Sequence, residues 1–293
     1  MNNSKMREGS IDCPHPGGMH RMAFVEWGDP ANPRVVLCVH GLTRCGRDFD
    51  DLARALAADF RVVCPDVAGR GQSEWLPEPE LYSLPQYGAD MLTLIAALAP
   101  AELHWVGTSM GGLIGMGIAA QPPGSSMFPI RRLVLNDVGP IITAVSLQRI
   151  KQYLGNAPRF GSYAEIEGYV RAVSAGFGAL TDAQWQHLTT HVIRRADDGK
   201  FEFLYDPAIA VSYAQALVAS GGQDIDLWPL YDRVACPTLL LRGAQSDLLT
   251  HDTAEAMTQR GPRAQLFEFA GVGHAPTLMA ADQIEAVRQF LLA

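Results

Sequence analysis

Short runs of aliphatic residues recur along the chain, each bounded by turn-forming residues and each about as long as a β-strand. Several of them, such as VVLCV from Val35 and TLLLRG from Thr238, are apolar at consecutive positions instead of alternating ones. Strands that are buried on both faces have this pattern, which is typical of a parallel sheet covered by helices. The predicted strands are 22–27, 34–40, 61–65, 103–107, 131–137, 237–243 and 265–270.

Segments with helical periodicity lie between most of these strands. In 48–58, for example, Leu52, Ala55 and Leu56 fall on one face of a helix. Strands that alternate with helices form βαβ units with right-handed crossovers, so the sequence predicts an α/β fold. The other predicted helices are 85–98, 110–121, 253–260 and 282–292.

The alternation stops between 141 and 228, where the sequence is rich in aromatic residues and has a helical pattern, with one polar turn at 197–199. We expect this segment to be a helical cap, inserted between two parts of one core, 21–140 and 229–293. The residues before the first predicted strand lack periodicity and include proline and glycine. We therefore expect a loose N-terminal tail over 1–20.

A serine follows the predicted strand 103–107, in the motif Gly107-Thr-Ser109-Met-Gly111, and a helical segment begins directly after it. A serine on a sharp strand-to-helix turn is pushed out above the sheet, and the two flanking glycines avoid collisions with neighbouring backbone. The helix that begins there directs free N–H groups at the serine, which favours a negative charge beside it. This context predicts that Ser109 is a nucleophile.

A serine hydroxyl needs a base to accept its proton, and the base needs a third group to orient it. Where the serine stands on a strand-to-helix GxSxG turn of this kind, the three residues follow in the order serine, acid, histidine. His274 stands between glycines, directly after the predicted strand 265–270, at the sheet edge where ligands bind. We therefore predict that His274 is the general base.

The other histidines after Ser109 fit structural roles better. His187 and His191 are four residues apart in the cap, which is typical of packing, and two histidines alone do not make a metal site. His251 begins a helix. The sequence thus predicts no bound metal.

The acid is expected at the end of strand 237–243, which precedes the strand leading to His274. Asp247 lies in the loop after strand 237–243 and is the preferred candidate. Asp137, at the end of strand 131–137, is the alternative, because its carboxylate could reach the same histidine from a neighbouring strand. An aspartate in a turn or at a helix start is the structural alternative for both.

Two backbone N–H groups are expected to bind the oxyanion, one from the residue after the nucleophile and one from the loop after an earlier strand. These are Met110 and Leu42. His40 is expected to shape the Leu42 loop through hydrogen bonds. Arg44, just beyond, is a candidate for pairing with a substrate carboxylate, although an exposed loop arginine is the commoner case.

Composition narrows the class of partner. The 293 residues are 48% hydrophobic, enough to bury a core without metal or disulfides. Lys and Arg number 23 against 31 Asp and Glu, a net charge of −8, and no basic cluster is present, which argues against nucleic acid and anionic membranes as partners. The five scattered cysteines indicate reduced thiols. No signal-like or membrane-spanning apolar stretch is visible, so we expect a cytoplasmic protein.

Four motifs in order make the chain resemble the α/β-hydrolase superfamily, and within it the small cap-bearing esterases, enol-lactonases and carbon–carbon bond hydrolases. They are HGL at 40–42, DxxGxGxS at 66–73, GTSMGG at 107–112 and GVGHAP at 271–276. The resemblance covers nearly the whole chain from about Met22. It implies an eight-stranded, mostly parallel sheet with an antiparallel second strand, one strand more than the pattern shows. A serine at 109 argues against haloalkane dehalogenases, which use aspartate there.

Together these features predict a cofactor-independent serine hydrolase that cleaves a small-molecule carboxylic ester, lactone or thioester through an acyl-enzyme. Two alternatives stay open. One is a carbon–carbon bond hydrolase of the meta-cleavage type, which uses the same residues. The other is a non-catalytic receptor on a hydrolase scaffold, which the presence of Ser109, Asp247 and His274 disfavours.

Overall fold

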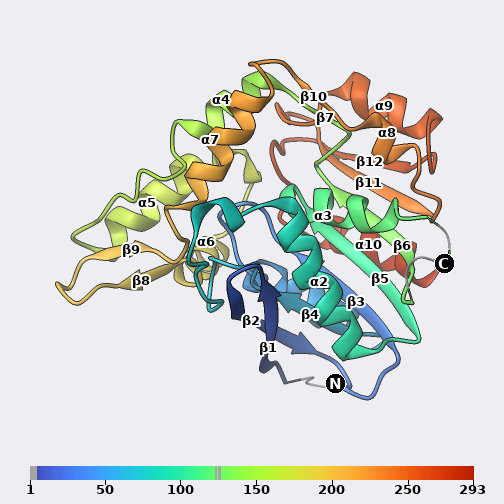
Figure 1. The fold of residues 1–293 in the computed structure, drawn as a ribbon, viewed down its shortest axis with the longest axis horizontal. Coiled ribbons are helices and arrows are strands. Elements are labelled where there is room, and N and C mark those ends of the chain that lie inside the picture. Colours follow the sequence, from blue (N-terminus) through green and yellow to red (C-terminus); the bar gives the residue numbers. More distant parts are fainter. Residues whose placement is uncertain (1–4, 123, 125–126) are drawn as a thin grey trace.

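One eight-stranded sheet forms the centre of the molecule (Figure 1). The computed structural model describes residues 5–122, 124 and 127–293. The strand order is β1-β2-β4-β3-β5-β6-β11-β12; β2 is antiparallel to both neighbours, and every pairing from β4 to β12 is parallel. The predicted fold class is therefore confirmed. The strands are β1 (Arg7–His15), β2 (Gly18–Trp27), β3 (Arg34–Val39), β4 (Arg61–Pro65), β5 (Glu102–Thr108), β6 (Ile130–Asn136), β11 (Thr238–Gly243) and β12 (Gln265–Phe269).

The N-terminal segment is where the sequence prediction failed. Residues 7–20, expected in a loose tail, form β1 and the start of β2, paired from Arg7↔Glu26 to His15↔Gly18. β1 is an edge strand in which only Cys13 is fully buried, so it lacks the apolar run that identified the central strands. The tail prediction is wrong for these residues, and residues 1–4 lie outside the described part of the chain.

Helices cover both faces of the sheet and create two apolar layers. In β3, Val35 and Leu37 join the layer under α2 and α3, whereas Val36 and Cys38 join the layer under α1 and α10. Alternate residues of one strand therefore serve opposite layers, which explains the uninterrupted apolar run. The helices of the core are α1 (Asp50–Leu56), α2 (Leu84–Leu98), α3 (Met110–Ala119), α8 (Trp228–Tyr231), α9 (His251–Gln259) and α10 (Ala281–Leu292), with the 3₁₀ turns η1 (Gly46–Phe49) and η2 (Pro79–Leu81).

A cap emerges between β6 and β11. Its two ends are joined by a short antiparallel pair, β7 (Ile141–Ile142) with β10 (Ile225–Asp226), at the ends of the segment predicted as the cap. The cap was expected to be helical throughout, but it also contains an antiparallel hairpin, β8 (Ile193–Arg195) with β9 (Phe201–Phe203), whose turn is the polar 197–199 segment. The remaining elements are α4 (Ala144–Lys151), α5 (Tyr163–Val173), η3 (Ala175–Phe177), α6 (Asp182–Thr190) and α7 (Ile209–Ala219).

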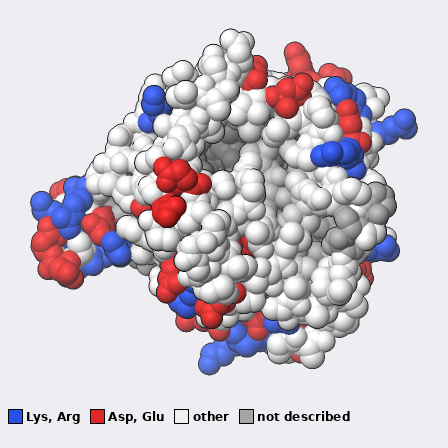
Figure 2. Space-filling model, in the orientation of Figure 1, with Lys and Arg blue, Asp and Glu red and all other residues white. Residues whose placement is uncertain are grey.

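Charges are unevenly distributed on the face viewed in Figure 1. Figure 2 shows acidic and basic side chains intermingled over the β8–β9 hairpin and along the periphery, and a hollow near the centre of this face surrounded mostly by uncharged residues. Among the described residues visible in this view, the basic side chains form no broad surface of the kind that binds nucleic acid (Figure 2). Among the described helices, none has both the length and the apolar character needed to cross a membrane.

Candidate active site

Ser109 sits on a sharp turn between β5 and α3. Its backbone has φ 51° and ψ −115°, a strained conformation for a residue with a side chain. A Cβ atom on Gly107 would collide with the backbone of Gly111, and one on Gly111 would collide with the carbonyl of Val39. The two glycines therefore allow the backbone approach that raises Ser109 above the sheet.

His274 lies beside this serine. Its Nε2 atom is 3.1 Å from the Ser109 Oγ atom, and its Nδ1 atom is 2.7 Å from the Asp137 Oδ2 atom. With the proton on Nδ1, the imidazole donates to Asp137 and accepts from the serine hydroxyl. Ser109, His274 and Asp137 thus form one hydrogen-bonded chain, although His274 lies 165 positions after Ser109 and 137 positions after Asp137 in the sequence.

The carboxylate in this chain belongs to Asp137, not to Asp247. The prediction that Asp247 contacts His274 is wrong: its side chain is 55% exposed and pairs with Arg149 of α4, with 3.1 Å between Oδ2 and Nε. β6 and β11 are adjacent in the sheet, so the loops that follow them lie together. The Asp137 side chain, fully buried, takes the position beside the imidazole.

The loop after β11 supports Asp137 instead of supplying the acid. Gly243 N–H donates to Asp137 Oδ1 at 2.9 Å, and the Ser246 hydroxyl donates to Oδ2 at 2.6 Å. With the imidazole, three donors satisfy a fully buried carboxylate, as a buried charge requires. Ser246 was not identified from the sequence, because a serine in a polar loop has no distinctive pattern.

Leu42 and Met110, the predicted oxyanion residues, lie on the two segments that border Ser109. Arg70, fully buried, contacts both: Nε donates to the Leu42 carbonyl at 2.8 Å, and Nη2 lies 3.7 Å from Met110 Sδ. A third bond, at 2.8 Å, joins Nη1 to the Tyr87 hydroxyl. Arg70 was not identified from the sequence either, although it lies inside the DxxGxGxS motif.

His40 holds the same loop, as the sequence suggested. Its Nδ1 atom is 2.7 Å from the Gly41 carbonyl oxygen, and Nε2 accepts from Val67 N–H at 2.9 Å. Burial lowers the pKa of His40 to about 4, so the ring is neutral at pH 7. A neutral ring can donate at one nitrogen and accept at the other, as these two bonds require.

Arg44 is not free to bind a substrate carboxylate. Its Nε and Nη2 atoms donate to the two Asp48 carboxylate oxygens, both at 2.7 Å, and Nη2 also donates to the Leu188 carbonyl at 3.0 Å. Burial acts to lower the pKa of the guanidinium, but Asp48 outweighs this effect and raises it. The structure thus ties Arg44 to its own helix turn and to the cap.

A cavity of about 140 Å³ adjoins Ser109 and His274. The segments 41–44 and 108–109 and the His274–Ala275 loop form one side of it, and the cap forms the other. The cap contributes mainly aromatic and aliphatic side chains, which suits an apolar segment of a small molecule. These cap residues are Arg149, Ile150, Tyr153, Tyr169, Val170, Val173, Ser174, Phe177, Val192, Phe203 and Tyr205.

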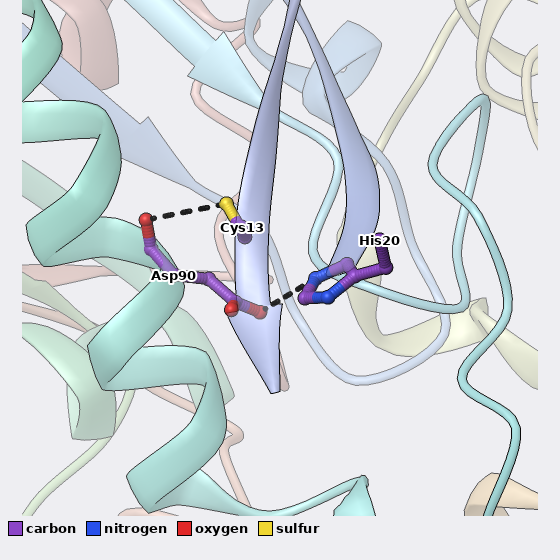
Figure 3. A group of neighbouring side chains, drawn as sticks. All are labelled: Cys13, His20 and Asp90. Carbon is purple, nitrogen blue, oxygen red and sulfur yellow. Dashed lines mark hydrogen bonds and ion pairs between the residues drawn. The ribbon is translucent and has the colours of Figure 1, made fainter. Parts of the chain in front are cut away.

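A group of possible metal ligands lies elsewhere, where β1 and β2 pack on α2 (Figure 3). His20 Nε2 is 3.2 Å from Asp90 Oδ2, and the Cys13 thiol lies 3.8 Å from the Asp90 carbonyl oxygen. Burial, with the nearby Asp90 carboxylate, raises the pKa of Cys13 to about 12. These contacts join the β1–β2 hairpin to α2.

The fold and the site define the class of protein. A family model described as "Alpha/beta hydrolase family" matches residues 36–287, and the chain belongs to this family. It is therefore a hydrolase.

Two protein relatives and one solved structure show which hydrolases the chain is similar to. The chain is 47% identical over 290 residues, 97% of each chain, to a 3-hydroxybutyrate-oligomer hydrolase of Cupriavidus necator. It is 27% identical over 239 residues, 80% of this chain and 74% of the relative, to an esterase of Mycobacterium tuberculosis. Among solved structures, an alpha/beta hydrolase from Novosphingobium aromaticivorans matches with a TM-score of 0.86 and 35% identity over 99% of both chains.

Proposed function

We propose that the protein is a cofactor-independent serine hydrolase that cleaves the ester bonds of short hydroxy-acid oligomers, such as oligomers of 3-hydroxybutyrate. The observation that carries the proposal is the hydrogen-bonded chain from Ser109 through His274 to Asp137 beside a small cavity. The 47% identical relative, which acts on 3-hydroxybutyrate oligomers, supports this choice of substrate.

The proposed reaction begins when Ser109 Oγ attacks the ester carbonyl and its proton passes to His274 Nε2. The carbonyl oxygen becomes an oxyanion, which the N–H groups of Leu42 and Met110 stabilise. The C–O bond to the leaving alcohol then breaks, and His274 gives its proton to that oxygen. Asp137 orients the imidazole and stabilises its positive charge.

A water molecule completes the cycle. His274 takes a proton from the water, whose oxygen attacks the acyl carbon. The bond to Ser109 Oγ breaks, and Oγ regains the proton from His274. A carboxylic acid leaves, and the enzyme returns to its starting state.

Replacing Ser109 tests this proposal. We expect Ser109→Ala to lose at least about 10⁴-fold in kcat on a 3-hydroxybutyrate dimer and on p-nitrophenyl butyrate, because the nucleophile is absent. Ser10→Ala, at an exposed position of β1, is the matched control and should keep full activity. A fluorophosphonate probe should label Ser109, as mass spectrometry of the labelled peptide would show. Full activity of Ser109→Ala would refute the mechanism.

A further inference from the structure

Two arginine side chains line the cavity beside Ser109, in a protein that is acidic overall. Among the described residues that line it are two arginines, Arg44 and Arg149, and no aspartate or glutamate. The whole chain has 31 acidic residues against 23 basic ones, so this lining is not an average sample of the protein. Each arginine has a carboxylate partner outside the lining, so the cavity can hold a negatively charged group only where that partner can be displaced.

Arg149 is the cation with spare binding capacity. Its Nε atom is buried and, within the described part of the chain, makes no hydrogen bond of good geometry, although Asp247 Oδ2 lies 3.1 Å away. The two side chains are 42% and 55% exposed, whereas Arg44 is 13% exposed and bound by two carboxylate oxygens of Asp48. Exposed ion pairs are weak, so a ligand can displace Asp247 far more easily than Asp48.

A hydroxyl group lies beside this arginine. Tyr153 lines the same cavity and follows Arg149 by four residues, just beyond the end of α4. Burial raises the pKa of Tyr153, and the charges of Arg149 and Asp247 are both close enough to act on it. The phenol therefore stays protonated and can donate a hydrogen bond.

We propose that Arg149 and Tyr153 form a subsite for a substrate carboxylate. In the absence of substrate, the Asp247 carboxylate pairs with the Arg149 guanidinium, and the carboxylate of an acidic ester displaces it. Oligomers of a hydroxy acid fit this subsite because each carries one free carboxylate at its end. The inference rests on the proposed function, since it places the carboxylate in the cavity of Ser109. It makes Arg149 a determinant of specificity and leaves the chemistry to Ser109 and His274.

Two esters that differ in one charge test the subsite: mono-p-nitrophenyl glutarate, which is anionic, and its neutral methyl ester, both followed by nitrophenol release. We expect Arg149→Gln to raise KM for the anionic ester by about 10- to 100-fold and to change KM for the neutral ester less than about 2-fold. Arg149→Lys, which keeps the charge, should retain much of the preference. Tyr153→Phe should raise KM for the anionic ester by a smaller factor.

Asp247→Asn gives an effect of the opposite sign. Removing the competing carboxylate should lower KM for the anionic ester by about 2- to 5-fold. If the Arg149–Asp247 pair were only a tether between cap and core, both variants would impair both esters equally. That result, or an unchanged preference in Arg149→Gln, overturns the proposal.

The control and the readouts separate this inference from the proposed function. Arg159→Gln removes another arginine of the cap, one that pairs with Asp198 and Glu202 and does not line the cavity, and should leave both KM values unchanged. Activity in Ser109→Ala would contradict the proposed function. An inactive Ser109→Ala together with an unaltered Arg149→Gln would contradict the subsite alone.

Discussion

Asp137 is held by three donors, two from the end of β11 and its loop and one from His274, and this arrangement makes a sharp prediction at the scale of single residues. Asp137→Asn should lower kcat on a neutral ester by about 10⁴-fold, because an amide favours the wrong imidazole tautomer and cannot stabilise the imidazolium. Asp247→Asn should keep kcat within a few-fold of the wild type. Steady-state kinetics of the two variants on p-nitrophenyl butyrate measure the difference. A collapse of activity in Asp247→Asn with normal activity in Asp137→Asn would reverse the assignment.

The same pair of residues shows what a sequence can predict about a site. Ser109 and His274 stand in glycine-containing motifs that can be recognised from the local sequence. The structure brings the two residues together. Asp137 and Asp247 both follow strands that end at the same edge, and no local pattern distinguishes them. The choice depends on the Ser246 and Gly243 donors, which turn the β11 loop toward Asp137, and this is tertiary information.

At the scale of elements, α3 presents two glycines with opposite expected effects. Gly111→Ala would place a Cβ against the Val39 carbonyl, which must shift the elbow, so we expect a large loss of activity and of the free energy of unfolding. A methyl group added at Gly117, on the same helix, would meet no atom within 4 Å apart from its own helix backbone and its chain neighbours. Gly117→Ala should therefore stabilise the protein by roughly 0.5–1 kcal/mol. Urea unfolding followed by circular dichroism measures both, and a tolerated Gly111→Ala would contradict the tight elbow.

Strands that are buried on both faces could be predicted from the sequence, because each carries an apolar run, whereas most short or edge strands could not. All seven predicted strands are present, including the edge strand β12, whose residues are mostly exposed. β1 was not predicted, because it pairs with β2 alone and most of its side chains are exposed or half-buried. The β8–β9 hairpin was not predicted, because strands of three residues are too short to show an alternation of apolar and polar positions.

At the scale of the whole molecule, the free energy of unfolding depends on pH through buried groups near the site. The pKa of His40 is about 4 in the folded state against 6.5 in the unfolded state, because burial disfavours the charged ring. The unfolded chain therefore binds the proton first, and His40 contributes stability above pH 6.5 that is lost as the pH falls toward 4. The shift corresponds to about 3 kcal/mol.

Asp66 acts in the opposite direction over nearly the same range. Burial raises its pKa to about 6 from 3.8, so the folded state binds the proton first and gains stability as the pH falls from 6 toward 3.8. The two groups oppose each other in the wild type, and single variants should separate them. Between pH 6.5 and 4, Asp66→Asn should lose about 3 kcal/mol more than the wild type, and His40→Asn should lose about 3 kcal/mol less.

Urea unfolding at pH 7, 6, 5 and 4 measures these slopes, and only the differences from the wild type matter, because every other titrating group is shared. Both variants lose hydrogen bonds at all pH values, since Asp66 accepts from Gly46 and Gln72, so each curve should also start lower at pH 7. An NMR titration of His40 in the folded wild type tests its pKa without any unfolding measurement. The chemical shifts of its ring protons should stay constant above about pH 5. Titration of His40 near 6.5, or parallel slopes in all three proteins, would contradict the prediction, because the loop that carries Leu42 would then tolerate a charged ring.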